Sequence, residues 1–268
     1  MVTEIAKEQG AYAAHFRLLQ EKSGASTPSW LARLREGAFN SFEQQGFPTP
    51  RLEEWKYTNV APLAKANFEP AVESTQALDL AALQPFLYEE ARASRLVFVN
   101  GFYRPELSST EALPAGVVAI DLAAALGEEK YAETLRERLA RAADFNENGF
   151  TALNTALFEG GAFVLVPAGA QVDVPLHLLF LADGGTTSSP RVLVVAERGS
   201  SATVIESYAA LGDREAYFTN AVVEVYVEEG ARLEHYKVQR EGADAFHVAT
   251  TRAALARAGS FNLTTVTL

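Results

Sequence analysis

The sequence predicts a mainly β protein with an α-helical N-terminal part, whose β part is a right-handed parallel β-helix that is partial and uncapped. Apolar residues follow a helical period through most of residues 1–148. That period disappears from residue 162 onward, and glycine-centred segments then recur at intervals of about 30 residues. We therefore expect a helical N-terminal domain with a short strand region over 1–148 and an incomplete β-helix core over 149–268.

Two helices are predicted first. Residues 3–22 place Ile5, Tyr12 and other apolar side chains at helical spacing among charged residues. The second helix is expected to begin with Thr27 as N-cap and Pro28 as its first residue, because proline is favoured at that position. Its apolar face needs a partner in a core.

Residues 49–63 are predicted to be extended, with Trp55 and Tyr57 on one side. We expect this segment to pack within the molecule, with docking of a partner as the alternative. Further helices are expected over 71–95, 121–143 and 146–161. A short buried strand is expected at 96–99, ending at Asn100 and Gly101.

The repeat is aligned on four glycines that are 30, 31 and 29 residues apart: Gly169, Gly199, Gly230 and Gly259. Apolar residues alternate before each glycine, and a second strand pattern follows it. Because glycine tolerates positive φ, it suits the corner between two strands of a coil. An antiparallel β-sandwich is the alternative fold, but its turns are usually only about 8–12 residues apart.

The last predicted strand, 261–268, has no amphipathic segment after it. A solenoid end without a cap leaves an open edge. We expect the chain to be a fragment of a longer protein, with cover by a partner or by a second copy of the chain as the alternatives.

Composition narrows the function classes. A net charge of −11 opposes nucleic-acid binding. The absence of cysteine removes disulfides, thiolate nucleophiles and thiolate metal ligands from this chain. No stretch is apolar enough to span a membrane, and the N-terminus does not resemble a signal peptide, so we expect a cytoplasmic protein.

Two segments resemble the SufB/SufD family, and its SufD branch in particular. The first is RLEEWKYTN at 51–59; the second combines FTALN at 150–154 with GGAFVLVP at 160–167. The resemblance runs from about residue 45 to the end of the chain, with matching order and spacing.

This resemblance implies a non-catalytic scaffold in iron–sulfur cluster assembly that pairs with a SufB-like paralogue and a SufC-like ATPase. It also implies that an iron–sulfur cluster and reduced flavin belong to the assembled complex, with none bound by this chain alone. The family's functional histidine lies beyond the region that matches, so the resemblance assigns no catalytic residue and no metal ligand here.

The residues themselves offer one polar candidate. His235 occupies a position that the glycine alignment gives to Val174, Val204 and Thr264 in other coils, with Glu234 and Glu206 nearby. We expect a hydrogen-bonded interior histidine, with a ligand or proton-carrier role as the alternative. His177 and His247 are expected to be partly exposed.

Two other functions stay open on the sequence. β-Helices also host carbohydrate-active enzymes, but the glutamates here form no ladder at a common offset from the glycines. A self-associating structural solenoid, forming a homodimer through its open edge, is the other alternative.

Overall fold

A computed structural model describes residues 2–268 except 24–26, 67, 75–77 and 213–215, and within the first helix the side chains of 2–9 and 23 are also outside the description. The predicted contribution of Ile5 therefore lies outside the described residues. None of the described helices is long and apolar enough to cross a membrane.

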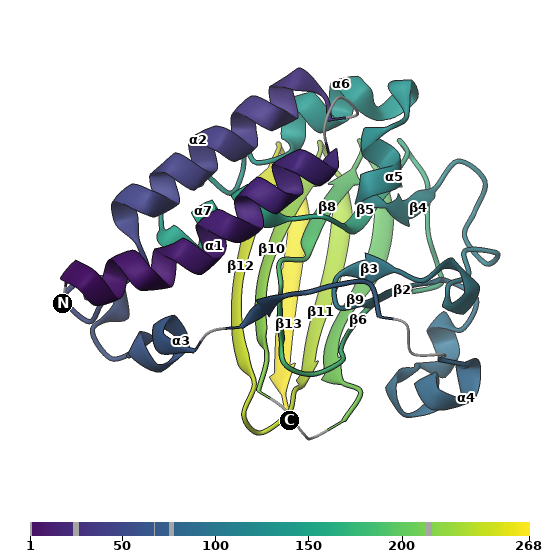
Figure 1. The fold of residues 1–268 in the computed structure, drawn as a ribbon. Coiled ribbons are helices and arrows are strands. Elements are labelled where there is room, and N and C mark those ends of the chain that lie inside the picture. The colour runs from purple at the N-terminus through teal and green to yellow at the C-terminus, as the bar shows by residue number, and fades with distance from the viewer. Residues whose placement is uncertain (1, 24–26, 67, 75–77, 213–215) are drawn as a thin grey trace.

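The predicted parallel β-helix is confirmed. Its strands alternate along the chain between two sheets that enclose a lumen (Figure 1). One sheet, sheet A, contains β5 (Gly161–Val166), β8 (Arg191–Ala196), β10 (Phe218–Val227) and β12 (Phe246–Leu255). Sheet B contains β6 (Leu176–Ala182), β9 (Ser201–Ala210), β11 (Arg232–Arg240) and β13 (Ser260–Thr267). Successive coils pair in parallel, and their inward valines and leucines form the lumen core.

Strands from the first half of the chain complete both sheets. The predicted strand at 96–99 is β2 (Arg95–Val99), which pairs in parallel with β6. β4 (Val118–Asp121) pairs antiparallel with β5. Two short strands, β1 (Glu69–Pro70) and β7 (Thr186–Ser188), pair with each other, and β3 (Phe102–Tyr103) pairs with β2.

Helices cover the outer face of sheet A. The first predicted helix is α1 (Val2–Ser23), and α2 (Ser29–Gln45) lies beside α7 (Gly149–Leu157), which in turn contacts β10 (Figure 1). The expectation that Thr27 caps α2 is wrong, because Pro28 occupies the N-cap and no side chain caps the helix. α5 (Leu122–Leu126) and α6 (Glu129–Arg138) cover the other end of the sheet.

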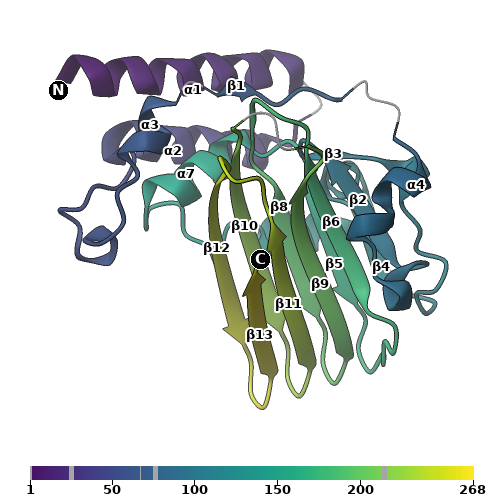
Figure 2. The ribbon, with the colours of Figure 1, turned by 90° about the horizontal axis from the view of Figure 1, so that it is seen from below.

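Two expected helices are broken into shorter pieces. The segment 71–95 forms α4 (Leu80–Leu83) and the 3-10 turns η3 (Gln84–Phe86) and η4 (Glu89–Ala91), and Pro85 falls at the first break. These turns cover β2 and β6 on the outside of sheet B (Figure 2). The segment 121–143 divides into α5 and α6 at Gly127, and the chain leaves α6 at Leu139 in an extended conformation.

The segment 49–63 is also more regular than predicted. It holds a 3-10 turn, η2 (Glu53–Trp55), and the helix α3 (Ala61–Lys65), and another 3-10 turn, η5 (Pro105–Leu107), follows β3. Trp55 packs 5.4 Å from Phe150 between ring centroids, whereas Tyr57 is 93% exposed. The prediction that Trp55 and Tyr57 share one side is therefore wrong, because the turn separates them.

Three of the four predicted corner glycines adopt positive φ, at 73° for Gly169, 68° for Gly199 and 68° for Gly230. At the fourth corner the residue with positive φ is Ala258, at 56°, and not Gly259. Strand pairing explains the difference: Leu255 pairs with Val227, so the last coil is one residue shorter than the glycine alignment assumes.

Candidate functional site

His235 and Glu206, two of the three predicted polar residues, meet inside the lumen. His235 Nε2 lies 2.7 Å from Glu206 Oε2, and both side chains are fully buried. Glu234 is not part of this contact. It follows the alternation of β11 to the outside of sheet B, where it accepts a hydrogen bond of 2.8 Å from Asn262 Nδ2.

The strand register corrects the ladder assigned to His235. Its neighbours are Val204 and Leu263, and Val204 pairs in turn with Leu176. The glycine alignment predicts Val174 and Thr264 in this ladder, and the strand register contradicts both. The first coil contains two more residues between its corner and β6, and the last coil is one residue shorter.

A chain of contacts extends the His235–Glu206 pair through the lumen. The Tyr208 hydroxyl donates a short hydrogen bond to Glu206 Oε1, and the Tyr208 ring meets the His247 ring edge to face at 4.5 Å between centroids. His247 Nδ1 lies 2.7 Å from Glu241 Oε1, whose other oxygen accepts a hydrogen bond from the Tyr217 hydroxyl.

Lys237 completes this group, with its ammonium 5.4 Å from the centre of the Tyr208 ring. Seven residues make up this lumen cluster: Glu206, Tyr208, Tyr217, His235, Lys237, Glu241 and His247. They come from β9, β11 and β12, from the residue before β10 and from the turn between β11 and β12.

Burial and charge act against each other in the lumen cluster. Burial alone would raise the pKa of Glu206, but hydrogen bonding and the charges of His235 and Lys237 outweigh it, so that pKa is lowered. Burial lowers the pKa of Lys237, and the charges of Glu206 and Glu241 only partly oppose this. Burial and Glu206 together raise the pKa of Tyr208 well above its ordinary value, which keeps the phenol neutral.

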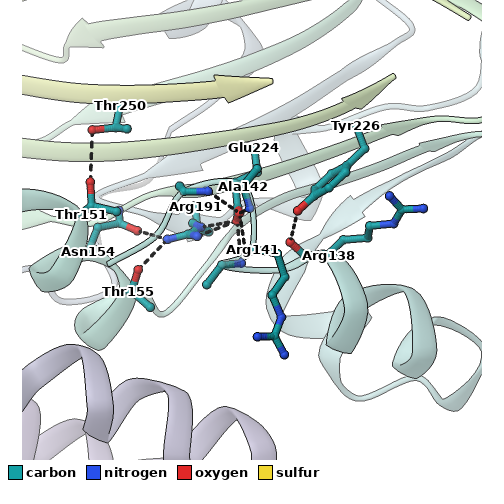
Figure 3. Close-up of polar contacts among 12 residues, drawn as sticks. Arg138, Arg141, Ala142, Thr151, Asn154, Thr155, Arg191, Glu224, Tyr226 and Thr250 are labelled. Atoms are coloured by element: carbon teal, nitrogen blue, oxygen red, sulfur yellow. Dashed lines mark hydrogen bonds and ion pairs between the residues drawn. The ribbon is translucent and has the colours of Figure 1, made fainter. Parts of the chain in front are cut away.

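A second buried polar group joins the helical head to the β-helix (Figure 3). Glu224, on the outer face of β10, accepts hydrogen bonds of 2.8 to 3.1 Å from four consecutive backbone N–H groups, those of residues 140–143. Arg191 on the neighbouring strand β8 donates to the same carboxylate at 2.6 Å through Nη2. Positive φ at Ala140 helps these amides converge on one anion.

Arg191 also reaches the head directly. Its Nη1 donates hydrogen bonds of 3.0 Å to Asn154 Oδ1 and to Thr155 Oγ1 on α7 (Figure 3). Sequence reasoning missed this group because its partners are far apart in the chain. The available signal is one arginine and one glutamate inside otherwise apolar strands, RVLVVA and VVEVYV.

The position of His177 differs from the one predicted. His177 is fully buried, which corrects the expectation that it is partly exposed, and its Nε2 lies 2.9 Å from Ser207 Oγ. The cause is the packing of Tyr88 against its ring, 5.0 Å away between centroids.

Within the described part of the chain, no three histidine, aspartate or glutamate side chains are grouped so that they could hold a metal ion.

Comparison with known proteins adds the family context. Residues 6–178 match the SufBD protein N-terminal region, and residues 179–268 match the SufBD core domain of the SUF system for FeS cluster assembly. A SufBD family protein of Synechocystis, slr0076, is 35% identical over 99% of this chain and 59% of its own length.

Two further relatives are more distant. The iron–sulfur cluster assembly protein SufD of Bacillus subtilis is 30% identical over 77% of this chain and 47% of its own length. The SufBD family protein ABCI9 of Arabidopsis thaliana is 26% identical over 78% of this chain and 48% of its own length. The chain thus spans about half the length of these curated relatives.

Proposed function

Because the chain belongs to the SufBD family of iron–sulfur cluster assembly proteins, we propose that it is a non-catalytic scaffold subunit of a cytoplasmic assembly complex. Its partners are a SufB-like paralogue and a SufC-like ATPase. An iron–sulfur cluster and reduced flavin occur only in the assembled complex. The cluster is the cargo of that complex, and this chain supplies shape and contact surface.

One observation carries this proposal: the β-helix core comes from a chain with no cysteine. Thiolates are the usual protein ligands of iron–sulfur clusters and the usual carriers of sulfur. A cluster assembled on a complex that contains this chain therefore takes its thiolates from a source outside these 268 residues. The SufB-like paralogue fills that role in the proposed complex.

Co-purification tests the proposal. The full-length gene product that contains this chain, tagged and co-expressed with the cysteine-bearing paralogue and the ATPase of its own genome, should retain both. Iron and sulfide should remain with the complex only while the paralogue keeps its cysteines. Retention of neither protein, or turnover of a substrate by the purified chain unaided, would contradict a scaffold role.

The same preparation distinguishes the alternatives. A β-helix carbohydrate-active enzyme would cleave a polyuronide alone, with the products visible by chromatography. A self-associating solenoid would run as a homo-oligomer in light scattering and would bind neither partner.

A further inference from the structure

Two small cavities adjoin each other between the surface beneath α1 and the lumen of the β-helix. The outer cavity has a volume of about 20 Å³, and His15 of α1 is among the residues that line it. The inner cavity, of about 10 Å³, is lined in part by Tyr208 and Glu241 of the lumen cluster. Gly101 and Ser188 line both cavities, so these two residues form the wall between them.

The outer cavity contains a buried polar atom that needs a partner. His15 is only 9% exposed, and its Nδ1 has no hydrogen-bond partner among the residues that the structure describes. Its Nε2 lies 3.8 Å from Glu159 Oε1, while Glu159 Oε2 accepts a hydrogen bond of 2.7 Å from Lys22 Nζ. Because a buried nitrogen without a partner is costly, a molecule that hydrogen-bonds to Nδ1 is favoured here.

The polar residues around each cavity can hold such a molecule. Besides His15 and Glu159, the outer cavity is lined by Asn100, Thr187, Ser188 and Ser189. The polar residues of the inner cavity are Ser188, Tyr208, Thr219 and Glu241. The oxygens of Glu241 already contact His247 and Tyr217, but each carboxylate oxygen can accept a second hydrogen bond.

The volumes of the cavities fit water. Roughly 10–15 Å³ is the smallest cavity volume that holds one water molecule, which then needs about two to four polar partners. The outer cavity exceeds this volume, and the inner cavity reaches its lower limit. Water both donates and accepts hydrogen bonds, so it can satisfy His15 Nδ1 in either tautomer of the ring.

We propose that ordered water occupies both cavities and forms a route from the surface beneath α1 to the lumen cluster. In the outer cavity, water is hydrogen-bonded to His15 Nδ1. In the inner cavity, it donates a hydrogen bond to Glu241. The route admits water and polar molecules of similar size, and the lumen cluster is hydrated from this side. This inference does not depend on the iron–sulfur role.

Nuclear Overhauser effects between water and methyl groups of the intact chain test the route. With alanine and leucine methyl groups labelled, Ala71 and Leu157 report on the outer cavity, and Leu181 and Ala209 report on the inner one. All four should show cross-peaks with water, with the sign of a long-lived bound molecule. Leu178, which is buried in the lumen core and lines neither cavity, should show none.

Substitutions of Ser188 test whether the two cavities are connected. An added Cβ at Gly101 would lie 3.7 Å from Ser188 Cβ, so a larger side chain at residue 188 would fill the space beside this wall. In Ser188→Leu the water signals at Leu181 and Ala209 should therefore be lost. Ser188→Ala is the matched control, because it removes the same hydroxyl without filling the space, and it should keep both signals.

A crystal structure of the parent chain keeps the test decisive if Ser188→Leu fails to fold. Ordered water should lie within about 2.7–3.2 Å of His15 Nδ1 and of a carboxylate oxygen of Glu241. Three results would each overturn the route: no water at either atom, water in the outer cavity alone, or unchanged signals at Leu181 and Ala209 in a folded Ser188→Leu variant.

Discussion

At the scale of single residues, Glu224 joins the helical head to the β-helix, although no sequence motif indicates this contact. Its fully buried carboxylate accepts hydrogen bonds from four amides that follow α6 and from the guanidinium of Arg191. Removing one member of a buried ion pair leaves the other charge uncompensated, at a cost of about 3–5 kcal/mol.

We therefore expect Glu224→Gln to lower the free energy of unfolding in urea by about 3 kcal/mol or more. Glu229→Gln, an exposed glutamate at the corner after β10, is the control and should change it by less than about 0.5 kcal/mol. Equal effects of the two substitutions would show that the buried contacts of Glu224 contribute little net stability.

His177 gives a pH dependence that is separate from the lumen cluster, because its side chain lies on the outer face of sheet B. Burial, with Arg240 and Arg95 nearby, lowers its pKa from 6.5 to about 3. The unfolded chain therefore binds a proton at His177 below pH 6.5 that the folded chain refuses, so stability is lost as the pH falls from 6.5 toward 3.

Between pH 6.5 and about pH 5, this residue should cost the parent chain about 2 kcal/mol of unfolding free energy. His177→Gln cannot take up a proton, so its urea-derived stability should fall by that much less over the same interval. Parallel pH profiles for the two proteins would rule out a neutral buried imidazole at this position.

At the scale of elements, the corners of the coils show how one residue sets a register. Ala258 holds a positive φ of 56°, which costs an L-residue with a Cβ about 1–2 kcal/mol. Gly259 follows it in a tight place, where an added Cβ would lie 3.0 Å from the Val227 carbonyl oxygen.

Substitutions at Ala258 and Gly259 should change the free energy of unfolding in opposite directions. Ala258→Gly should raise the free energy of unfolding by about 0.5–1 kcal/mol, because relief of the left-handed conformation exceeds the added entropy of the unfolded chain. Gly259→Ala should lower it, because the new methyl group meets backbone atoms. Thermal unfolding monitored by circular dichroism distinguishes the two, and a loss of stability in Ala258→Gly would show that the left-handed corner is not at residue 258.

The same corner shows how much of the fold can be predicted from the sequence. Periodic apolar residues and recurring glycines predict the coils, because each coil repeats one local conformation. Pro85 and Gly127 are visible in the sequence as possible helix breaks. Because apolar residues keep a helical spacing on both sides of each, the pattern predicts one long helix where the structure has shorter ones. The glycine alignment predicts His235 as a ladder residue with Glu206 nearby. Lys237, Glu241 and His247 join them only through strand pairing and a turn that composition does not encode.

At the scale of the whole molecule, the helical head and the β-helix share their cores. Leu96, Phe98 and Ala119 from the first half of the chain lie in the lumen core. Phe218 of β10 lies in a core with residues of α1, α2 and α7. Neither part can therefore unfold without exposing apolar surface of the other.

Both tryptophans, Trp30 and Trp55, belong to the head, whereas most strand residues belong to the β-helix. Tryptophan fluorescence and far-ultraviolet circular dichroism should therefore report coincident urea transitions, as expected of one cooperative unit.

Phe150→Ala should shift both transitions together by about 3–5 kcal/mol, because Phe150 packs against Phe47, Trp55 and Phe218. Tyr57→Ala, at a side chain that is 93% exposed, should shift neither. If Phe150→Ala moved the fluorescence transition and left the dichroism transition in place, the head and the β-helix would be separate folding units, and the shared cores would not couple them.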